Sequence, residues 1–132
     1  MQAYPVRLVP GQDLRTSLEA ILSEQGMAAA FVLQAIGSLS KARIRFAGMP
    51  RASELTGDME ILTLAGTLSV DGAHLHISVA NAQGQVTGGH VDYGCTVRTT
   101  AEVLVALLPA HAFSRPTDAA SGFNELVIAP AL

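Results

Sequence analysis

Three histidines stand at positions whose spacing could build a metal site. His74 and His76 are two residues apart in a stretch with β-strand alternation, so both side chains project from one face. His90 follows two glycines, which let its backbone approach neighbouring strands closely. Three imidazoles from a strand pair and an adjacent loop form the donor set of an open Zn²⁺-type site. The alternative is three ordinary histidines, partly exposed or hydrogen-bonded, because no metal-binding motif of adjacent residues surrounds them.

Three further residues are weaker candidates for chemistry. Glu60 shares a strand face with Leu62 and Leu64, where a carboxylate is unusual; it could be an acid or base, or lie where the strand frays at the sheet edge. Cys95, the only cysteine, could be a soft metal ligand or a nucleophile, although a lone cysteine in an apolar β protein usually packs in the core. His111 is interpreted as an ordinary surface residue. The sequence therefore assigns no catalytic residue and leaves the existence of an enzymatic activity open.

A short cationic stripe is the second candidate surface. Lys41, Arg43 and Arg45 alternate with apolar residues, which places three positive charges on one strand face that could contact phosphates of nucleic acid. The alternative is a solvated face or ion pairs, and it is favoured because no stacking aromatic residues interleave with the cations. The net charge of −3 also argues against a strongly cationic surface.

The composition sets the class of protein. The 132 residues suffice for one domain, residues 1–132, and the 49% hydrophobic content indicates a globular chain. Only 14% of the residues are charged, against roughly 25% in a typical soluble domain, so we expect a homo-oligomer that covers apolar surface. A single cysteine excludes an intramolecular disulfide and fits a reducing compartment. Without a signal peptide or a membrane-spanning stretch, a soluble cytoplasmic protein with no membrane partner is expected.

The elements that position these residues begin with a strand over 3–9 and one helix. Asp13 is the expected N-cap and Gly26 the expected C-terminal stop. The helix buries an apolar stripe with helical spacing, made of Leu14, Leu18, Ile21 and Leu22. A strand over 31–36 follows, and then an alternating segment puts Ser40, Ala42, Ile44 and Phe46 on its apolar face. Residues 47–57 are expected to form an exposed loop.

A β-hairpin carries the first two histidines. The runs 59–70 and 73–80 flank the pair Asp71-Gly72, which is a strong signal for a two-residue turn. That turn predicts an aliphatic face with Val70 opposite Ala73, Leu68 opposite Leu75, Gly66 opposite Ile77 and Leu64 opposite Val79. The polar face then has Ser69 opposite His74, Thr67 opposite His76 and Ala65 opposite Ser78.

The remaining segments extend the sheet. Residues 86–93 contain the Gly-Gly-His segment, and residues 96–108 are predicted as a strand because their β-branched content outweighs a candidate helix capping box. Two short strands, 113–116 and 123–128, are joined by a polar turn. The sum is an α+β domain, mostly antiparallel sheet with one flanking N-terminal helix.

The order of these pieces resembles the plants and prokaryotes conserved (PPC) domain family, from about residue 4 to residue 128. The segments that carry the resemblance are Gly37–Phe46, Met59–Ser69, Asp71–His76, Gly88–Val91, Gly94–Val97, Thr99–Val103 and Gly122–Leu126. The resemblance implies an antiparallel sheet with a flanking helix, assembled as a homotrimer. In plants the domain follows a DNA-binding AT-hook, and bacterial members are commonly labelled DNA-binding by that kinship. Some members hold a metal at the histidines that correspond to His74, His76 and His90.

Three functions follow as hypotheses. The first is a stand-alone trimeric module that associates with DNA or regulatory proteins, although this sequence contains no AT-hook. The second is a metal-dependent enzyme or small-ligand-binding protein that uses a divalent ion, Zn²⁺, at His74, His76 and His90. The third is a scaffold in which the histidines bridge subunits.

Overall fold

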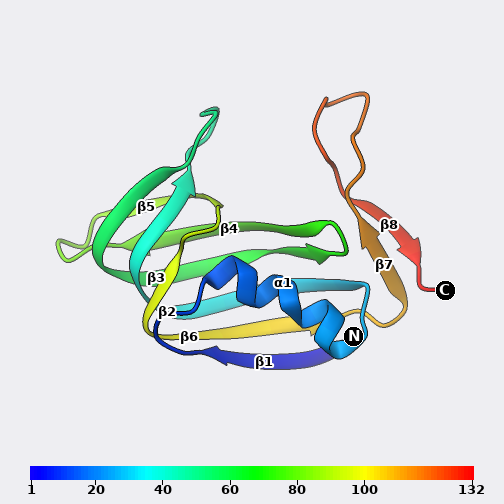
Figure 1. Cartoon of the computed structure of the whole chain (residues 1–132), viewed down its shortest axis with the longest axis horizontal. Helices are drawn as coiled ribbons and strands as arrows, with labels where there is room; N and C mark the ends of the chain where they lie inside the picture. The colour runs from blue at the N-terminus through cyan, green and yellow to red at the C-terminus, as the bar shows by residue number, and fades with distance from the viewer.

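A curled, six-stranded antiparallel sheet with one helix packed on its inner face forms the body of the computed structural model, which describes residues 1–132 (Figure 1). The strands follow the order β1-β6-β2-β3-β4-β5 across the sheet, and β7 and β8 form a separate two-stranded sheet beside it. The elements are β1 (Gln2–Leu8), α1 (Leu14–Gln25), β2 (Ala29–Arg45), β3 (Ser53–Ser69), β4 (Gly72–Ala80), β5 (Val86–Val91), β6 (Thr96–Leu107), β7 (His111–Ser114) and β8 (Val127–Pro130). The predicted mostly antiparallel sheet with one N-terminal helix is confirmed.

Helix α1 has the predicted ends and the predicted buried stripe. The Asp13 carboxylate accepts a hydrogen bond from the Thr16 backbone N–H, and Gly26 takes the left-handed conformation at φ 63° that ends the helix. The buried side chains are Leu14, Leu18, Ile21 and Leu22, as predicted. They pack in one aliphatic core with the inward side chains of all six sheet strands.

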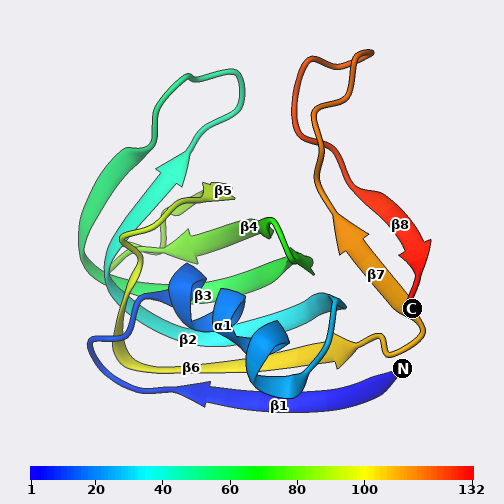
Figure 2. The same cartoon turned by 45° about the vertical axis from the view of Figure 1, so that its right-hand side comes forward.

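Strand β2 is one long, bent element where the sequence indicates a strand and a separate alternating segment. A register shift between Leu39 and Lys41 buries Leu39 and Ala42 and leaves Ser40 exposed, so the predicted place of Ser40 on the apolar face is wrong. Strand β3 begins at Ser53, so only the first part of the predicted exposed loop 47–57 lies outside strands. The far end of β2 curls over to pair with β5, which partly closes the sheet (Figure 2).

The β3–β4 hairpin forms at the predicted place with a different register. The central turn residues are Val70 and Asp71, so Leu68 lies opposite Ala73 and every predicted partner near the turn is displaced by two residues. The predicted turn requires positive φ at Asp71, whereas no residue other than glycine has positive φ in this chain, and Gly72 begins β4 at φ 111°. Val70 is consequently 67% exposed and not on the aliphatic face. A displacement of two residues preserves the faces, so His74 and His76 keep their predicted side.

A second irregularity in β3 corrects the interpretation of Glu60. The register shifts between Ile61 and Thr63, so Leu62 is exposed and Ile61 and Leu64 point into the core. Glu60 is exposed on the outside of the strand, and its predicted place on the face of Leu64 is wrong.

Strands β7 and β8, with the segment between them, form a C-terminal arm, residues 111–130 (Figure 1). Both predicted closing strands exist, shifted by two to four residues from the expected 113–116 and 123–128. Phe113 anchors the arm: it is buried, and its ring meets that of Phe31 edge to face at 5.7 Å. All four residues of β8 are exposed. No helix of the protein is both long and apolar enough to cross a membrane.

Candidate metal centre

The three predicted histidines meet on the outer surface of β4 and β5. His74 and His76 alternate with buried Leu75 and Ile77, which aims both imidazoles away from the core. His90 lies directly opposite His76 in the β4–β5 register. One candidate ligand atom from each residue lies within 4.8 Å of the others. This histidine cluster could therefore hold a metal ion.

The rings of the histidine cluster are arranged at angles to one another. His74 and His90 stack at 4.8 Å between centroids with 20° between ring planes. His76 stands edge-on to both, with centroids 5.0 Å from His74 and 4.6 Å from His90. Because one candidate ligand atom from each ring lies within 4.8 Å of the others, the three rings could supply three of the four ligands of a tetrahedral ion.

Glycines allow the strands beneath the cluster to approach. Gly66 lies on β3 opposite Leu75 of β4, and a side chain at this position would overlap the carbonyl oxygen of His74. At Gly89 an added Cβ would lie 2.5 Å from the Arg45 carbonyl oxygen, and both glycines have φ above 150°. The predicted role of the glycines before His90, a close backbone approach, is confirmed.

Arg15, on the first turn of α1, joins the two strands that carry the cluster. Its guanidinium donates hydrogen bonds to the carbonyl of Ala73 at 3.0 Å and to the carbonyl of Val91 at 3.1 Å. Those carbonyls belong to the residues immediately before His74 and after His90. Glu19, at 3.2 Å, holds the guanidinium from the other side. Arg15 therefore fixes the spacing of two histidines that are 16 residues apart in the chain.

Arg115, from the arm, makes the one side-chain hydrogen bond to the cluster. Its Nη2 lies 3.1 Å from Nδ1 of His74, and the guanidinium also donates to the Asn124 carbonyl at 3.2 Å. Arginine has no acceptor atom, so Nδ1 must accept, and the proton of neutral His74 is on Nε2. A neutral imidazole has one free lone pair, so an ion on Nδ1 would displace Arg115 directly, and an ion on Nε2 would require the proton on Nδ1, which then cannot accept from Arg115. The donor set thus fits a metal ion on the condition that Arg115 releases His74.

The electrostatics favour neutral imidazoles. Burial, followed by the charge of Arg45, lowers the pKa of His90 to about 4 from the ordinary 6.5. Burial and the neighbouring Arg115 also lower the pKa of His74. Metal ligation requires the unprotonated ring, so both residues are in the competent state at neutral pH.

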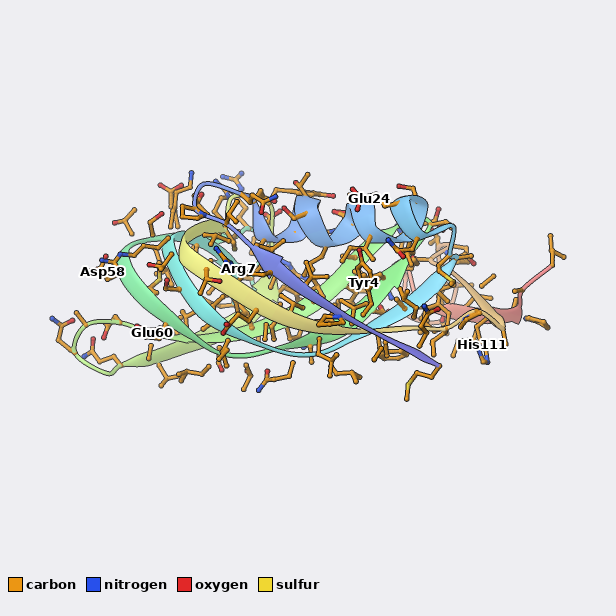
Figure 3. All side chains as sticks on the ribbon, turned by 90° about the horizontal axis from the view of Figure 1, so that it is seen from below. Tyr4, Arg7, Glu24, Asp58, Glu60 and His111 are labelled. Atoms are coloured by element: carbon orange, nitrogen blue, oxygen red, sulfur yellow. The ribbon has the colours of Figure 1, made fainter.

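The other candidates from the sequence lie outside the cluster. Glu60 pairs with Ala80 at the far end of the β3–β4 ladder, and Figure 3 shows Glu60 and His111 at opposite ends of the molecule. His111 is exposed, as predicted. Cys95 is fully buried, its sulfur accepts a hydrogen bond from the Arg43 backbone N–H at 3.3 Å, and burial raises the pKa of its thiol. Core packing is therefore its role.

The predicted cationic stripe is divided by the structure. Lys41 lies 3.9 Å from Glu54 in an exposed ion pair. The Arg43 side chain packs over Gly94, where a Cβ would lie 2.5 Å from Cδ of Arg43. Arg45 donates to the Met49 carbonyl at 3.3 Å, and Arg43 and Arg45 both line a cavity beside His90. Two of the three cations thus turn toward the histidine cluster.

Comparison with known proteins places this fold in a wider group. Residues 1–109 match the model of the Plants and Prokaryotes Conserved (PCC) domain. The chain is 48% identical over 130 residues to a protein named Bifunctional protein GlmU from Synechococcus sp. (strain JA-2-3B'a(2-13)), a match that covers 98% of this chain and 21% of that protein. The chain therefore spans about a fifth of the length of this curated relative.

Solved structures resemble the whole chain. A hypothetical protein from Salmonella cholerae-suis superposes with a TM-score of 0.95 at 41% identity, covering 99% of this chain and 95% of that one. A metal-containing protein from Archaeoglobus fulgidus gives 0.81 at 27% identity, with 96% and 94% covered. A protein from Ralstonia eutropha, described as a "putative DNA-binding protein", gives 0.80 at 26% identity, with 94% and 90% covered.

Proposed function

The chain belongs to the Plants and Prokaryotes Conserved domain family, and from that premise we propose that it binds a divalent metal ion, Zn²⁺, through His74, His76 and His90. The convergence of three imidazole nitrogens within 4.8 Å carries the proposal. Three imidazole ligands suit Zn²⁺ among the common divalent ions. When held by these three residues, a Zn²⁺ ion would leave a position for water or another ligand and would supply Lewis-acid chemistry there.

Two surrounding arginines act on the proposed site in opposite ways. Arg15 holds the strand ends on which His74 and His90 sit. Arg115 occupies Nδ1 of His74 and would have to release it for an ion to bind; Glu125, whose Oε2 lies 4.0 Å from Nη2 of Arg115, would then offer that guanidinium a replacement partner. Second-sphere contacts of this kind orient metal ligands and tune their affinity.

Elemental analysis of the purified protein tests the metal site. We expect about one ion per chain in the wild type, consistent with three protein ligands and one open position. The double variant His74→Ala/His76→Ala should hold almost none, while His111→Ala, which removes an exposed histidine outside the cluster, should keep its full content. Circular dichroism confirms that each variant is folded. Equal metal content in the double variant and the wild type would refute the assignment.

We propose further that the chain assembles as a homotrimer. Four large apolar side chains on the sheet are 40% to 54% exposed, namely Leu33, Ile36, Leu62 and Leu104. Two of them, Ile36 and Leu104, line a hollow of about 560 Å³ between β1, β2 and β6, and most of its lining is apolar. Apolar surface of this kind is characteristic of contacts between subunits. Analytical ultracentrifugation should give a mass three times the 13.7 kDa of one chain, and a monomer would contradict the proposal.

Association with DNA, directly or through regulatory proteins, is the second candidate function. Arg43 and Arg45 have no carboxylate within 4.0 Å, and the Ralstonia relative is described as DNA-binding. Mobility of duplex DNA on a gel tests it: retardation should weaken steeply with added salt and with Arg43→Gln, but not with Arg98→Gln, whose guanidinium pairs with Asp58. The absence of retardation at low salt would remove direct binding.

A further inference from the structure

Positive charge is concentrated around the histidine cluster. Five of the eight Lys and Arg residues of the chain line two adjoining cavities there, namely Arg15, Arg43, Arg45, Arg51 and Arg115. The acidic residues that line the same cavities are Asp92 and Glu125. This region is therefore cationic in a chain whose net charge is −3. We call these five residues the arginine cluster.

The two cavities have the size of small-molecule sites. Their volumes are about 590 and 480 Å³, and both are lined by Arg15, Arg45 and His90, so they meet beside the proposed metal site. The β2–β3 loop, which carries Arg51, and the arm, which carries Arg115, extend to the same side of the sheet near β4 and β5 (Figure 2). Two adjoining cavities of this size fit a small ligand better than they fit the flat surface of a macromolecule.

Most of these guanidiniums lack acidic partners. Arg15 pairs with Glu19 at 3.2 Å and Arg115 approaches Glu125 at 4.0 Å, whereas Arg43, Arg45 and Arg51 have no carboxylate within 4.0 Å. Arg45 is half-buried and makes one hydrogen bond from its guanidinium, to the Met49 carbonyl, which leaves most of its N–H donors free. Partly buried, unpaired cations are stabilised by an anion that supplies acceptor oxygens.

We propose that the arginine cluster binds a small organic oxyanion, a carboxylate or a phosphate ester, whose charge lies against Arg45 and Arg51 and whose nearest oxygen takes the open position of the metal ion. The metal contact rests on the proposed Zn²⁺ site, whereas the contacts to the arginines do not. Guanidinium groups match the paired oxygens of carboxylates and phosphates. Phe123, 74% exposed at the wall of the larger cavity, offers an apolar surface to the organic part of the ligand.

Isothermal titration calorimetry with inorganic phosphate and with malonate, at low ionic strength, tests the inference on Zn²⁺-loaded protein. At least one probe should bind saturably, and the more tightly bound probe distinguishes a phosphate from a carboxylate ligand. Arg45→Gln should weaken binding about tenfold or more, since it removes a hydrogen bond to a charged group. Arg51→Gln, at an exposed position, should weaken it without a risk to folding. Arg98→Gln, which pairs with Asp58 elsewhere, should leave binding unchanged.

Metal content, measured on the same samples, separates this inference from the proposed metal site. Metal-loaded wild type that binds neither probe, or equal weakening by Arg98→Gln, overturns the oxyanion site and leaves the metal site standing. If the wild type holds no metal, binding that depends on Arg45 and Arg51 supports the arginine site while removing the metal contact. Duplex DNA that binds through Arg45 when neither small anion does overturns the inference in favour of nucleic acid.

Discussion

Two hollows of similar volume lie on this sheet and differ in their chemistry. The first, about 560 Å³, is lined largely by apolar side chains such as Val6, Ile36 and Leu104. The second, about 590 Å³, is lined by Arg15, Arg45 and Arg115 together with His74 and His90. Strand β2 contributes to both, with Ile36 in its first half and Arg45 at its end. One long strand therefore supplies a surface suited to protein and a surface suited to a charged ligand.

The difference follows from how the strand is bent. Around Ile36 the sheet is open, and no element covers its outer side chains, so burial there requires another molecule. At Arg45 the strand curls over to pair with His90, and the arm adds Arg115 from a third direction. A cavity enclosed by several elements can direct polar side chains from each of them toward one ligand, whereas a single open sheet face cannot.

The largest expected effect comes from placing charge in the apolar hollow. Ile36→Lys with Leu104→Lys puts two cations on surface that the proposed trimer buries, and an unpaired buried charge is strongly unfavourable. We expect loss of the trimer in analytical ultracentrifugation with metal content unchanged. Val86→Lys, which alters an exposed apolar residue outside this hollow, is the control. A double variant that stays trimeric would place the subunit contact elsewhere.

The second prediction tests the backbone approach beneath the histidines. Gly66→Ala forces a Cβ against the His74 carbonyl at a φ of 156°, so the free energy of unfolding should fall by about 3 kcal/mol. Gly84→Ala, also at positive φ but with no atom within 4 Å of its Cβ, should cost about 1 kcal/mol. Urea denaturation measures both. Equal losses would show that backbone conformation alone, and not strand spacing, requires the glycine at 66.

Metal removal provides the third prediction. An ion that binds only the folded chain stabilises it by about 2.7 kcal/mol when its free concentration is a hundred times its Kd. Chelation should therefore lower the urea midpoint of the wild type. The same treatment of His74→Ala/His76→Ala should have no effect, and a drop in that variant would indicate a different ion.

The fourth prediction concerns the arm. Because Arg115 and the ion compete for the lone pair of His74, Arg115→Gln should tighten metal binding by roughly tenfold, about 1.4 kcal/mol. Competition titration with a chromogenic chelator measures the affinity, with Arg98→Gln as the matched control. Weaker metal binding in Arg115→Gln would mean that the guanidinium holds His74 in place for the ion.

The smallest effect is expected from pH in metal-free protein, because His90 is only partly buried and solvent screens its charge. The folded pKa of His90 is about 4, below the ordinary 6.5, so the unfolded chain takes up a proton that the folded chain resists. Stability should therefore be full above about pH 6.5 and decline as the pH falls toward 4. Denaturation midpoints across this range measure the decline, which should be shallower in His90→Gln. An equal slope in the variant would assign the effect to other groups.

Much of this site could be predicted because its information is local. Alternation places His74 and His76 on one face even though the predicted register was wrong, since a displacement of two residues conserves faces. The capped helix from Asp13 to Gly26 was likewise readable from short-range signals. Bulges were not: the shift near Leu62 exposes a leucine that strict alternation buries, and only the three-dimensional fit of β3 to β4 determines it.

The roles of the two arginines that contact the site were not predicted from the sequence, for different reasons. Arg115 follows His74 by 41 residues and reaches it through the fold of the arm, so no spacing rule connects them. Arg15 did carry a signal. It occupies the first turn of a helix, where a cation opposes the helix dipole and no acidic residue accompanies it. A cation at this unfavourable position indicates a role outside the helix, and in this protein Arg15 donates hydrogen bonds to the carbonyls of Ala73 and Val91.

The fully buried sulfur of Cys95 has a practical consequence. It is the only thiol in the chain, its raised pKa suppresses the reactive thiolate, and it lies in the core beside the strand end that carries Arg43. An alkylating reagent can thus reach it only when that part of the sheet transiently opens. The rate of its modification would therefore measure how often the sheet opens. A ligand that stabilises the folded chain would slow this rate, so its binding could be followed at a natural residue.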